Sequence, residues 1–237
     1  MELLYLPLLT MVAAGVGTIT GFGTSTIMVP VLSLWLPIPV TLLFVGVIHW
    51  FGDIWKMLLF RKGFSWKLVL WFGIPGVLVS FWAARLPLDL PEDLMKRVLG
   101  LFLVGYVVFL WLNRNWKIKP SNTTALLGGS LSGFFAAIFG VGGAIRGMFL
   151  SAFNLNKSVY IFTSGAIGFL IDSSRLTQYW LGGTKIAGLE TALAICVPTS
   201  LIGAYLAKKV IDKVPQKSFR IVVAVALLLV GVRYLLA

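Results

Sequence analysis

The chain has 237 residues, of which 59% are hydrophobic and only 12% are charged, and its mean hydropathy is +0.95. Soluble domains are about half apolar and about a quarter charged, so one water-soluble core cannot bury this much apolar surface. The apolar stretches have the length of helices and lack the alternation over about ten residues that marks an outer-membrane barrel. The composition therefore predicts an all-α polytopic membrane protein whose outer surface contacts the lipid bilayer.

The net charge of +12 does not indicate nucleic-acid binding, because the cations form no single basic face. Most cations lie in short breaks between apolar runs, as is typical of cytoplasmic loops. Cys196 is the only cysteine and His49 the only histidine. An intramolecular disulfide is therefore excluded. We expect no metal site and no cofactor, because the carboxylates are scattered along the chain.

Ten apolar segments follow one another along the chain, five in each half. In the first half they cover residues 3–20, 24–36, 38–60, 66–85 and 93–112. In the second half they cover residues 124–140, 143–154, 157–180, 184–208 and 216–236. The second segment of each half follows a glycine cluster and is short against about 30 Å of hydrocarbon at about 1.5 Å per residue. The sequence leaves open whether these short segments are re-entrant or spanning.

The order of these features repeats after a shift of 119 residues. Both halves show a glycine break, a short segment, an aspartate followed three residues later by a cation, and two further spans marked by proline. The positions that the shift superimposes are Gly21 and Gly140, Gly23 and Gly142, Gly46 and Gly165, Asp53 and Asp172, and Lys56 and Arg175. We therefore predict a first transmembrane repeat at 1–119 and a second at 120–237, which together form one transport domain.

Each repeat is expected to cross the membrane an odd number of times, because its first two segments return the chain to the starting side and three crossings follow. The second repeat then has inverted topology. The positive-inside rule gives the orientation, with twelve Lys and Arg residues on the predicted cytoplasmic side and five on the other. The cytoplasmic segments are Arg61–Lys67, Arg114–Lys119, Lys157 and Lys208–Arg220. Both termini are expected outside a plasma membrane, the bacterial inner membrane.

Two pairs of opposite charges are predicted at membrane depth, where charges are costly and rarely face lipid. Asp53 and Lys56 stand three residues apart on one predicted helix, and Asp172 and Arg175 stand three apart on another. Side chains at this spacing share a helix face, so each pair can neutralise itself. The pairs either lock the two repeats together or separate and re-form during transport.

His49 lies one turn before Asp53 on the same helix face, and Gly168 holds the matching place in the second half. The charge of histidine changes near neutral pH, so His49 and Asp53 are candidates for carrying a coupled proton. The alternative is a packed polar residue without a role in transport.

Arg146 is a third cation at membrane depth, and no acid lies within four positions of it. Its planar guanidinium suits oxyanions such as carboxylate, sulfonate or phosphate. The alternative is a long-range ion pair with Asp53, Asp172 or Glu190, since charges inside a membrane tend to pair. Arg146 is therefore either the main charge partner of a bound anion or one half of a structural pair.

The glycine breaks are candidate anion sites, because a helix that restarts after a break presents unpaired N–H groups and the positive end of its dipole. Glycine also permits close backbone approach, and hydroxyl groups add further donors. The residues that provide these features are Gly21, Gly23, Thr24, Ser25, Gly142 and Gly143. Two such breaks in inverted halves would meet near the midplane of the membrane, where transporters of this construction bind substrate.

The sequence contains no Walker A, HExxH or GxSxG motif. ATP-driven transport and common hydrolase chemistry therefore lack support in this chain. No nucleophile–base pair stands out either, so we do not expect an enzyme.

Residues 21–32 read GFGTSTIMVPVL and residues 140–143 read GVGG, so a glycine motif opens the short segment of each half. These motifs and the two related halves resemble the TauE/SafE family of sulfite and organosulfur exporters, also called the 4-toluene sulfonate uptake permease family. The resemblance covers nearly the whole chain. The second half departs from the family pattern at two places: Phe149 stands where Pro30 has its counterpart, and Arg146 replaces an expected aliphatic residue.

The resemblance implies transport of a sulfur-containing anion, such as sulfite, thiosulfate, or a C2 sulfonate like sulfoacetate or taurine. With the residues above, it predicts a secondary transporter, working as an exporter by alternating access around a midplane anion site. A passive anion channel and a non-transporting membrane scaffold are the alternatives. The oligomeric state stays open, with a homodimer favoured by the frequency of two-fold assemblies.

Overall fold

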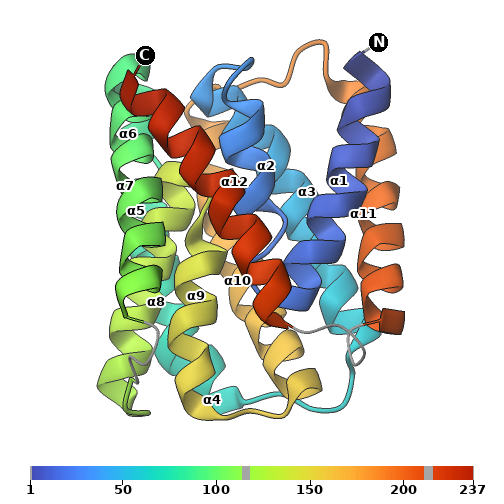
Figure 1. Ribbon diagram of the computed structural model, residues 1–237, viewed down its shortest axis with the longest axis vertical. Coiled ribbons are helices and arrows are strands. Elements are labelled where there is room, and N and C mark those ends of the chain that lie inside the picture. Colours follow the sequence, from blue (N-terminus) through green and yellow to red (C-terminus); the bar gives the residue numbers. More distant parts are fainter. Residues whose placement is uncertain (1, 114–117, 211–215, 237) are drawn as a thin grey trace.

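The structure is a computed structural model of the chain, and it describes residues 2–113, 118–210 and 216–236. These residues form helices and turns without a β-strand, which confirms the predicted all-α class of membrane protein. The helices run side by side along the long axis of the molecule, and both termini lie near the same end (Figure 1).

The first half of the chain contains the predicted segments as helices. They are α1 (Glu2–Thr20), α2 (Ser25–Leu32), α3 (Ile38–Leu59), α4 (Trp66–Leu68), α5 (Ile74–Ala83), α6 (Leu86–Asp89) and α7 (Glu92–Leu112). A π-helical turn, Val69–Gly73, joins α4 to α5 without a break in the chain direction. The fourth predicted span is therefore one continuous helical stretch with a widened turn near its beginning.

The second half follows the same order. Its helices are α8 (Asn122–Phe139), α9 (Gly142–Leu150), α10 (Lys157–Leu181), α11 (Glu190–Val210) and α12 (Gln216–Leu236), with a 3₁₀ turn, Ser151–Phe153, after α9. The N-terminus of α8 is capped by the Ser121 hydroxyl, which accepts a hydrogen bond from the Thr124 amide.

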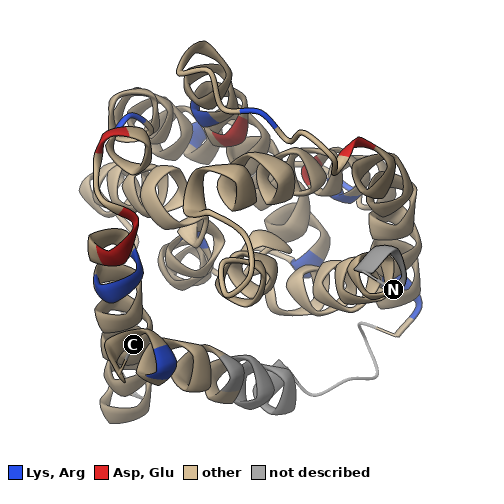
Figure 2. Ribbon diagram, turned by 90° about the horizontal axis from the view of Figure 1, so that it is seen from above, with Lys and Arg blue, Asp and Glu red and all other residues tan. Residues whose placement is uncertain are grey.

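Several helices are long and apolar enough to cross a membrane. In the described part of the chain five helical stretches meet this condition: Ile38–Leu59, Trp66–Asp89, Glu92–Leu112, Asn122–Phe139 and Glu190–Val210. Lys, Arg, Asp and Glu occupy only short parts of the ribbon, and most of the helical length carries uncharged residues (Figure 2). The protein is therefore a multi-pass membrane protein.

The two short helices do not cross a membrane by themselves. Helix α2 has eight residues and α9 has nine, so they extend over about 12 Å and about 14 Å of a hydrocarbon core about 30 Å thick. Gly21 and Gly23, before α2, have φ angles of +77° and +80°, and Gly140, before α9, has a φ angle of +67°. Glycine adopts these backbone conformations without the strain of a side chain. The predicted glycine breaks are thus confirmed as sharp changes of backbone direction.

The main helix pairs each join one helix of the first half to one helix of the second half. When one half is shifted onto the other, these pairs are exchanged for one another or for themselves. Helix α1 packs against α11, and the corresponding helices α8 and α5 pack against each other. Helix α3 packs against its counterpart α10, and α7 against its counterpart α12. This pattern is the one expected of two related halves; the division into inverted repeats at 1–119 and 120–237 stays a prediction.

Helices α3 and α10 are antiparallel and approach closely through two glycines. A methyl group built on Gly46 of α3 would lie 3.3 Å from both terminal nitrogens of Arg175 on α10. A methyl group built on Gly165 of α10 would lie 3.4 Å from Cβ of Lys56 on α3. The glycines therefore give each helix room for the cationic side chain of the other.

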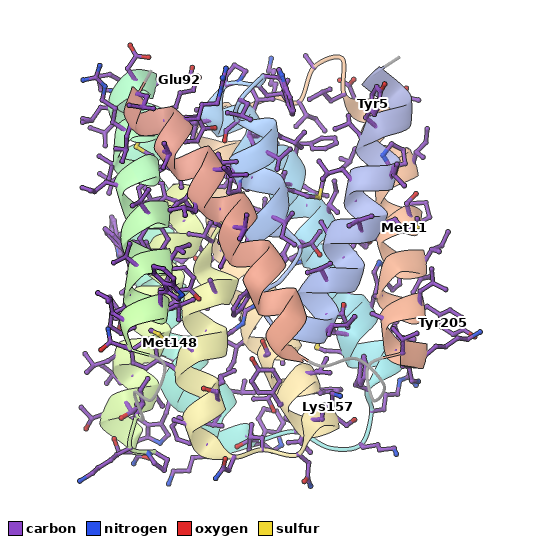
Figure 3. The ribbon with its side chains drawn as sticks, viewed as in Figure 1. Tyr5, Met11, Glu92, Met148, Lys157 and Tyr205 are labelled. Carbon is purple, nitrogen blue, oxygen red and sulfur yellow. The ribbon has the colours of Figure 1, made fainter. Side chains whose placement is uncertain are left out.

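The basic segments used to predict the orientation lie at one end of the molecule. The Ser158 hydroxyl donates a hydrogen bond to the Phe60 carbonyl at 3.3 Å, and Lys208 Nζ lies 5.9 Å from the centre of the Phe60 ring. Lys157 lies at the opposite end from Glu92 (Figure 3). Residues 114–117 and 211–215 of these segments lie outside the described residues. That this end faces the cytoplasm stays a prediction.

Candidate functional site

The buried charges of the described residues gather in one cluster. Three helices contribute them: α3 provides His49, Asp53 and Lys56, α9 provides Arg146, and α10 provides Asp172 and Arg175. All six residues are at most 4% exposed, as the sequence predicted for charges at membrane depth. We call these six residues the charge cluster.

Glu190, one of the three alternative partners considered for Arg146, does not belong to the charge cluster. It is exposed and is the first residue of α11. A carboxylate is stabilised at a helix N-terminus by the positive end of the helix dipole and by water. Glu190 therefore needs no partner inside the membrane.

The two predicted pairs are confirmed as contacts within single helices. On α3, Lys56 Nζ lies 2.7 Å from Asp53 Oδ1. On α10, Arg175 Nε lies 2.7 Å from Asp172 Oδ1. Charge-assisted hydrogen bonds of this length are among the stronger ones in proteins. Each carboxylate thus has one oxygen held by its own helix and one oxygen directed elsewhere.

His49 connects the two helices. Its Nδ1 lies 2.6 Å from Asp172 Oδ2 on α10 and 3.7 Å from Asp53 Oδ2 on its own helix. An ionised carboxylate only accepts hydrogen bonds, so Nδ1 carries the hydrogen. In the neutral ring Nε2 then bears a lone pair; it has no hydrogen-bond partner and faces Gly23, where a built methyl group would collide with it.

Arg146 makes no ion pair in the described part of the chain. Its Nε donates a hydrogen bond of 3.0 Å to the Ser164 hydroxyl, whereas its Nη2 is buried without a partner. A methyl group built on Gly168 would lie 2.7 Å from this Nη2 and would also touch Asp53 Oδ2, a second buried atom without a partner. Of the two alternatives left by the sequence, the direct ion pair with Asp53, Asp172 or Glu190 is not formed.

Gly168 is the site residue that sequence reasoning missed. It corresponds to His49 in the other half, and it leaves open the space into which Arg146 and Asp53 extend. Asp172 is therefore contacted by an imidazole, while Asp53 faces the guanidinium of Arg146 across a glycine. The absence of a side chain at this position was visible in the sequence, but its consequence depends on the approach of α9.

The two glycine breaks are in direct contact. A methyl group built on Gly143 would collide with the carbonyl of Phe22, which lies between Gly21 and Gly23. Thr24, Ser25, Gly142 and Gly143 are buried. The Thr24 hydroxyl does not cap α2 and lies 3.6 Å from a methyl group built on Gly52 of α3.

The predicted break residues do not all reach the charge cluster. Gly23 faces His49, and Thr24 faces the same helix. Gly21 instead faces the phenol of Tyr160, and Gly142 packs on α8, where its carbonyl accepts a hydrogen bond of 2.9 Å from Ser132. Ser25 is buried as the first residue of α2.

Three of the cluster residues have the donor atoms of a metal site. Ligand atoms of His49, Asp53 and Asp172 lie within 4.8 Å of one another. Both carboxylates are already neutralised by cations at 2.7 Å, and Arg146 adds a further positive charge nearby. Among the described residues the buried cations Lys56, Arg146 and Arg175 already outnumber the buried carboxylates, so this donor set does not fit a resident metal ion.

Buried charges beside broken short helices, inside a bundle of membrane-spanning helices, are typical of membrane transporters. A family model described as sulfite exporter TauE/SafE matches residues 6–234, nearly the whole chain. The chain belongs to this family, whose members are transporters and not enzymes. A comparison with curated proteins found no match.

The buried pair on α10 should contribute far more to stability than a surface pair of equal length. Asp172→Asn leaves Arg175 buried without its counter-charge, so we expect a loss of about 3–5 kcal/mol in the free energy of unfolding. The matched control is Glu92→Gln, which removes the partly exposed pair with Lys96, also 2.7 Å long, and should cost less than about 1 kcal/mol. Reversible denaturation in detergent measures both; equal small losses would contradict the assignment.

Proposed function

We propose that the protein is a secondary transporter that exports a small sulfur-containing anion, such as sulfite, thiosulfate or a C2 sulfonate like sulfoacetate or taurine. One observation carries this proposal: Arg146 is 1% exposed, its Nη2 has no partner, and the helix that holds it begins where the two glycine breaks meet. The description of the family as sulfite exporters supports the sulfur chemistry of the substrate.

The surroundings of Arg146 favour an anion. A buried guanidinium without a counter-charge is costly, and a bound oxyanion would supply both the charge and the hydrogen-bond acceptors. Helices α2 and α9 both begin at the breaks, so the positive ends of their dipoles add to the field there. Gly23, Thr24 and Gly143 are the break residues proposed to line the site, with Gly21, Ser25 and Gly142 shaping the backbone around them.

Alternating access is the proposed mechanism. The two halves would rock about the crossing of α3 and α10, exposing the anion first to one side and then to the other. Asp53–Lys56 and Asp172–Arg175 would re-form different contacts in the two states, because each carboxylate has one oxygen directed away from its own helix. We also propose that the protein lies in the plasma membrane with its basic loops in the cytoplasm and both termini outside. The proposed oligomeric state is a homodimer.

Anion-dependent stabilisation of the purified protein tests the site. A ligand at a hundred times its Kd should stabilise the protein by about 2.7 kcal/mol. We expect one sulfur oxyanion from a panel of sulfite, thiosulfate, sulfoacetate, taurine, phosphate, acetate and chloride to raise the Tm, and Arg146→Gln to remove this response. Arg85→Gln is the control, because Arg85 is exposed and should leave the response intact.

Two outcomes would contradict the proposal. If no anion shifted the Tm of the unaltered protein, Arg146 would be structural and the chain would act as a membrane scaffold. If an anion bound but its flux into proteoliposomes did not saturate and showed no counter-transport, the protein would be a passive channel.

Proton coupling through His49 and Asp53 makes a separate prediction. We expect transport into proteoliposomes to accelerate with a proton gradient, since His49 Nδ1 contacts Asp172 and lies 3.7 Å from Asp53, and an imidazole can carry a proton between such groups. Asp53→Asn should remove this acceleration and keep anion-induced stabilisation. Rates that ignore the gradient in the unaltered protein, or that respond equally in Asp53→Asn, would exclude coupling through this residue.

A further inference from the structure

The charge cluster holds one positive charge more than it neutralises. Among the described residues, the buried cations are Lys56, Arg146 and Arg175, and the buried carboxylates are Asp53 and Asp172. With a neutral His49 the cluster therefore carries a single excess positive charge. A net charge inside a water-excluded site is unfavourable, and neutralising it is the largest electrostatic gain that a ligand can bring.

From this balance we infer that the site selects its substrate by valence: it takes a monoanion when His49 is neutral and a dianion only when His49 is protonated. The inference rests on the proposed function, which places the anion beside Arg146. It divides the proposed substrates into classes. Hydrogensulfite and monovalent alkyl sulfonates cancel the excess charge, whereas sulfite, thiosulfate and sulfoacetate are dianions and taurine is a zwitterion without net charge.

The cost of dehydration works in the same direction. The free energy needed to move an ion out of water rises with the square of its charge, so a dianion loses about four times as much hydration free energy as a monoanion of the same size. The single excess positive charge of the cluster offsets the cost of dehydrating one negative charge. A dianion would leave the closed site with one uncompensated negative charge.

His49 is the group that can change this balance. The charged groups around it are Asp53 and Lys56 on its own helix, Asp172 and Arg175 on α10, and Arg146 on α9. The glycine break that faces Nε2 contributes the uncharged backbone of Gly23.

In the neutral ring Nε2 presents a lone pair to the glycine break, and a lone pair repels an anion. A proton taken from solvent by Nε2 turns this atom into a donor and raises the excess charge of the cluster to two. The resulting imidazolium is held by two carboxylates, with Nδ1 at 2.6 Å from Asp172 and 3.7 Å from Asp53. The proton and a second negative charge therefore bind together.

Methanesulfonate and sulfate form a matched pair of probes, because they are similar tetrahedral anions that differ by one charge. Binding to the purified full-length protein is measured by calorimetry at about pH 8 and about pH 5.5, on either side of the usual titration of histidine. At about pH 8 we expect the Kd for sulfate to be at least about tenfold higher than for methanesulfonate. At about pH 5.5 this ratio should fall by at least about tenfold.

In His49→Gln the ratio of the Kd for sulfate to the Kd for methanesulfonate should be the same at both pH values and equal to that of the unaltered protein at about pH 8. The amide can still donate to Asp172 and does not titrate. His49→Asn is a second variant of the same kind, should His49→Gln not fold. Sulfate binding as tightly as methanesulfonate at about pH 8, or a ratio that still changes with pH in both variants, would overturn the inference while leaving the anion site in place. Binding of neither probe in the unaltered protein would overturn the proposed function as well.

Discussion

The burial of three cations and two carboxylates inside a bundle surrounded by lipid is the constraint on which this structure depends. Lipid provides no hydrogen bonds, so a buried charge needs a partner in the protein or a bound ligand. Helices α3 and α10 meet this requirement by crossing at Gly46 and Gly165, which leave room for Arg175 and Lys56. The crossing thus fixes the positions of both carboxylates, and the glycine breaks with their short helices complete the enclosure around them.

The cluster is nearly symmetric, and it departs from symmetry at His49 and Arg146. Where α3 carries His49, α10 carries Gly168. Asp172 therefore receives the imidazole, while Asp53 faces Arg146, which α9 brings in from the second break. Each carboxylate keeps one oxygen on the cation of its own helix and directs the other toward the rest of the cluster.

The helices, the glycine breaks and the two ion pairs on α3 and α10 could be predicted because they depend on local spacing along the chain. Tertiary contacts could not: the main partner of His49 lies on the other helix, and Arg146 hydrogen-bonds to Ser164. The role of Gly168 was missed, since an absent side chain has meaning only once its neighbours are placed. Glu190 was considered as a partner of Arg146 because hydropathy began this segment at residue 184, whereas α11 begins at Glu190.

A crystal structure of the protein with 2-bromoethanesulfonate, a monovalent sulfonate whose bromine scatters anomalously, tests the central claim most directly. The account predicts a sulfonate within hydrogen-bonding distance of Arg146, with the bromine near the glycine breaks. A ligand bound elsewhere would contradict it. A direct ion pair between Arg146 and Asp53, with no sulfonate bound beside Arg146, would also contradict it.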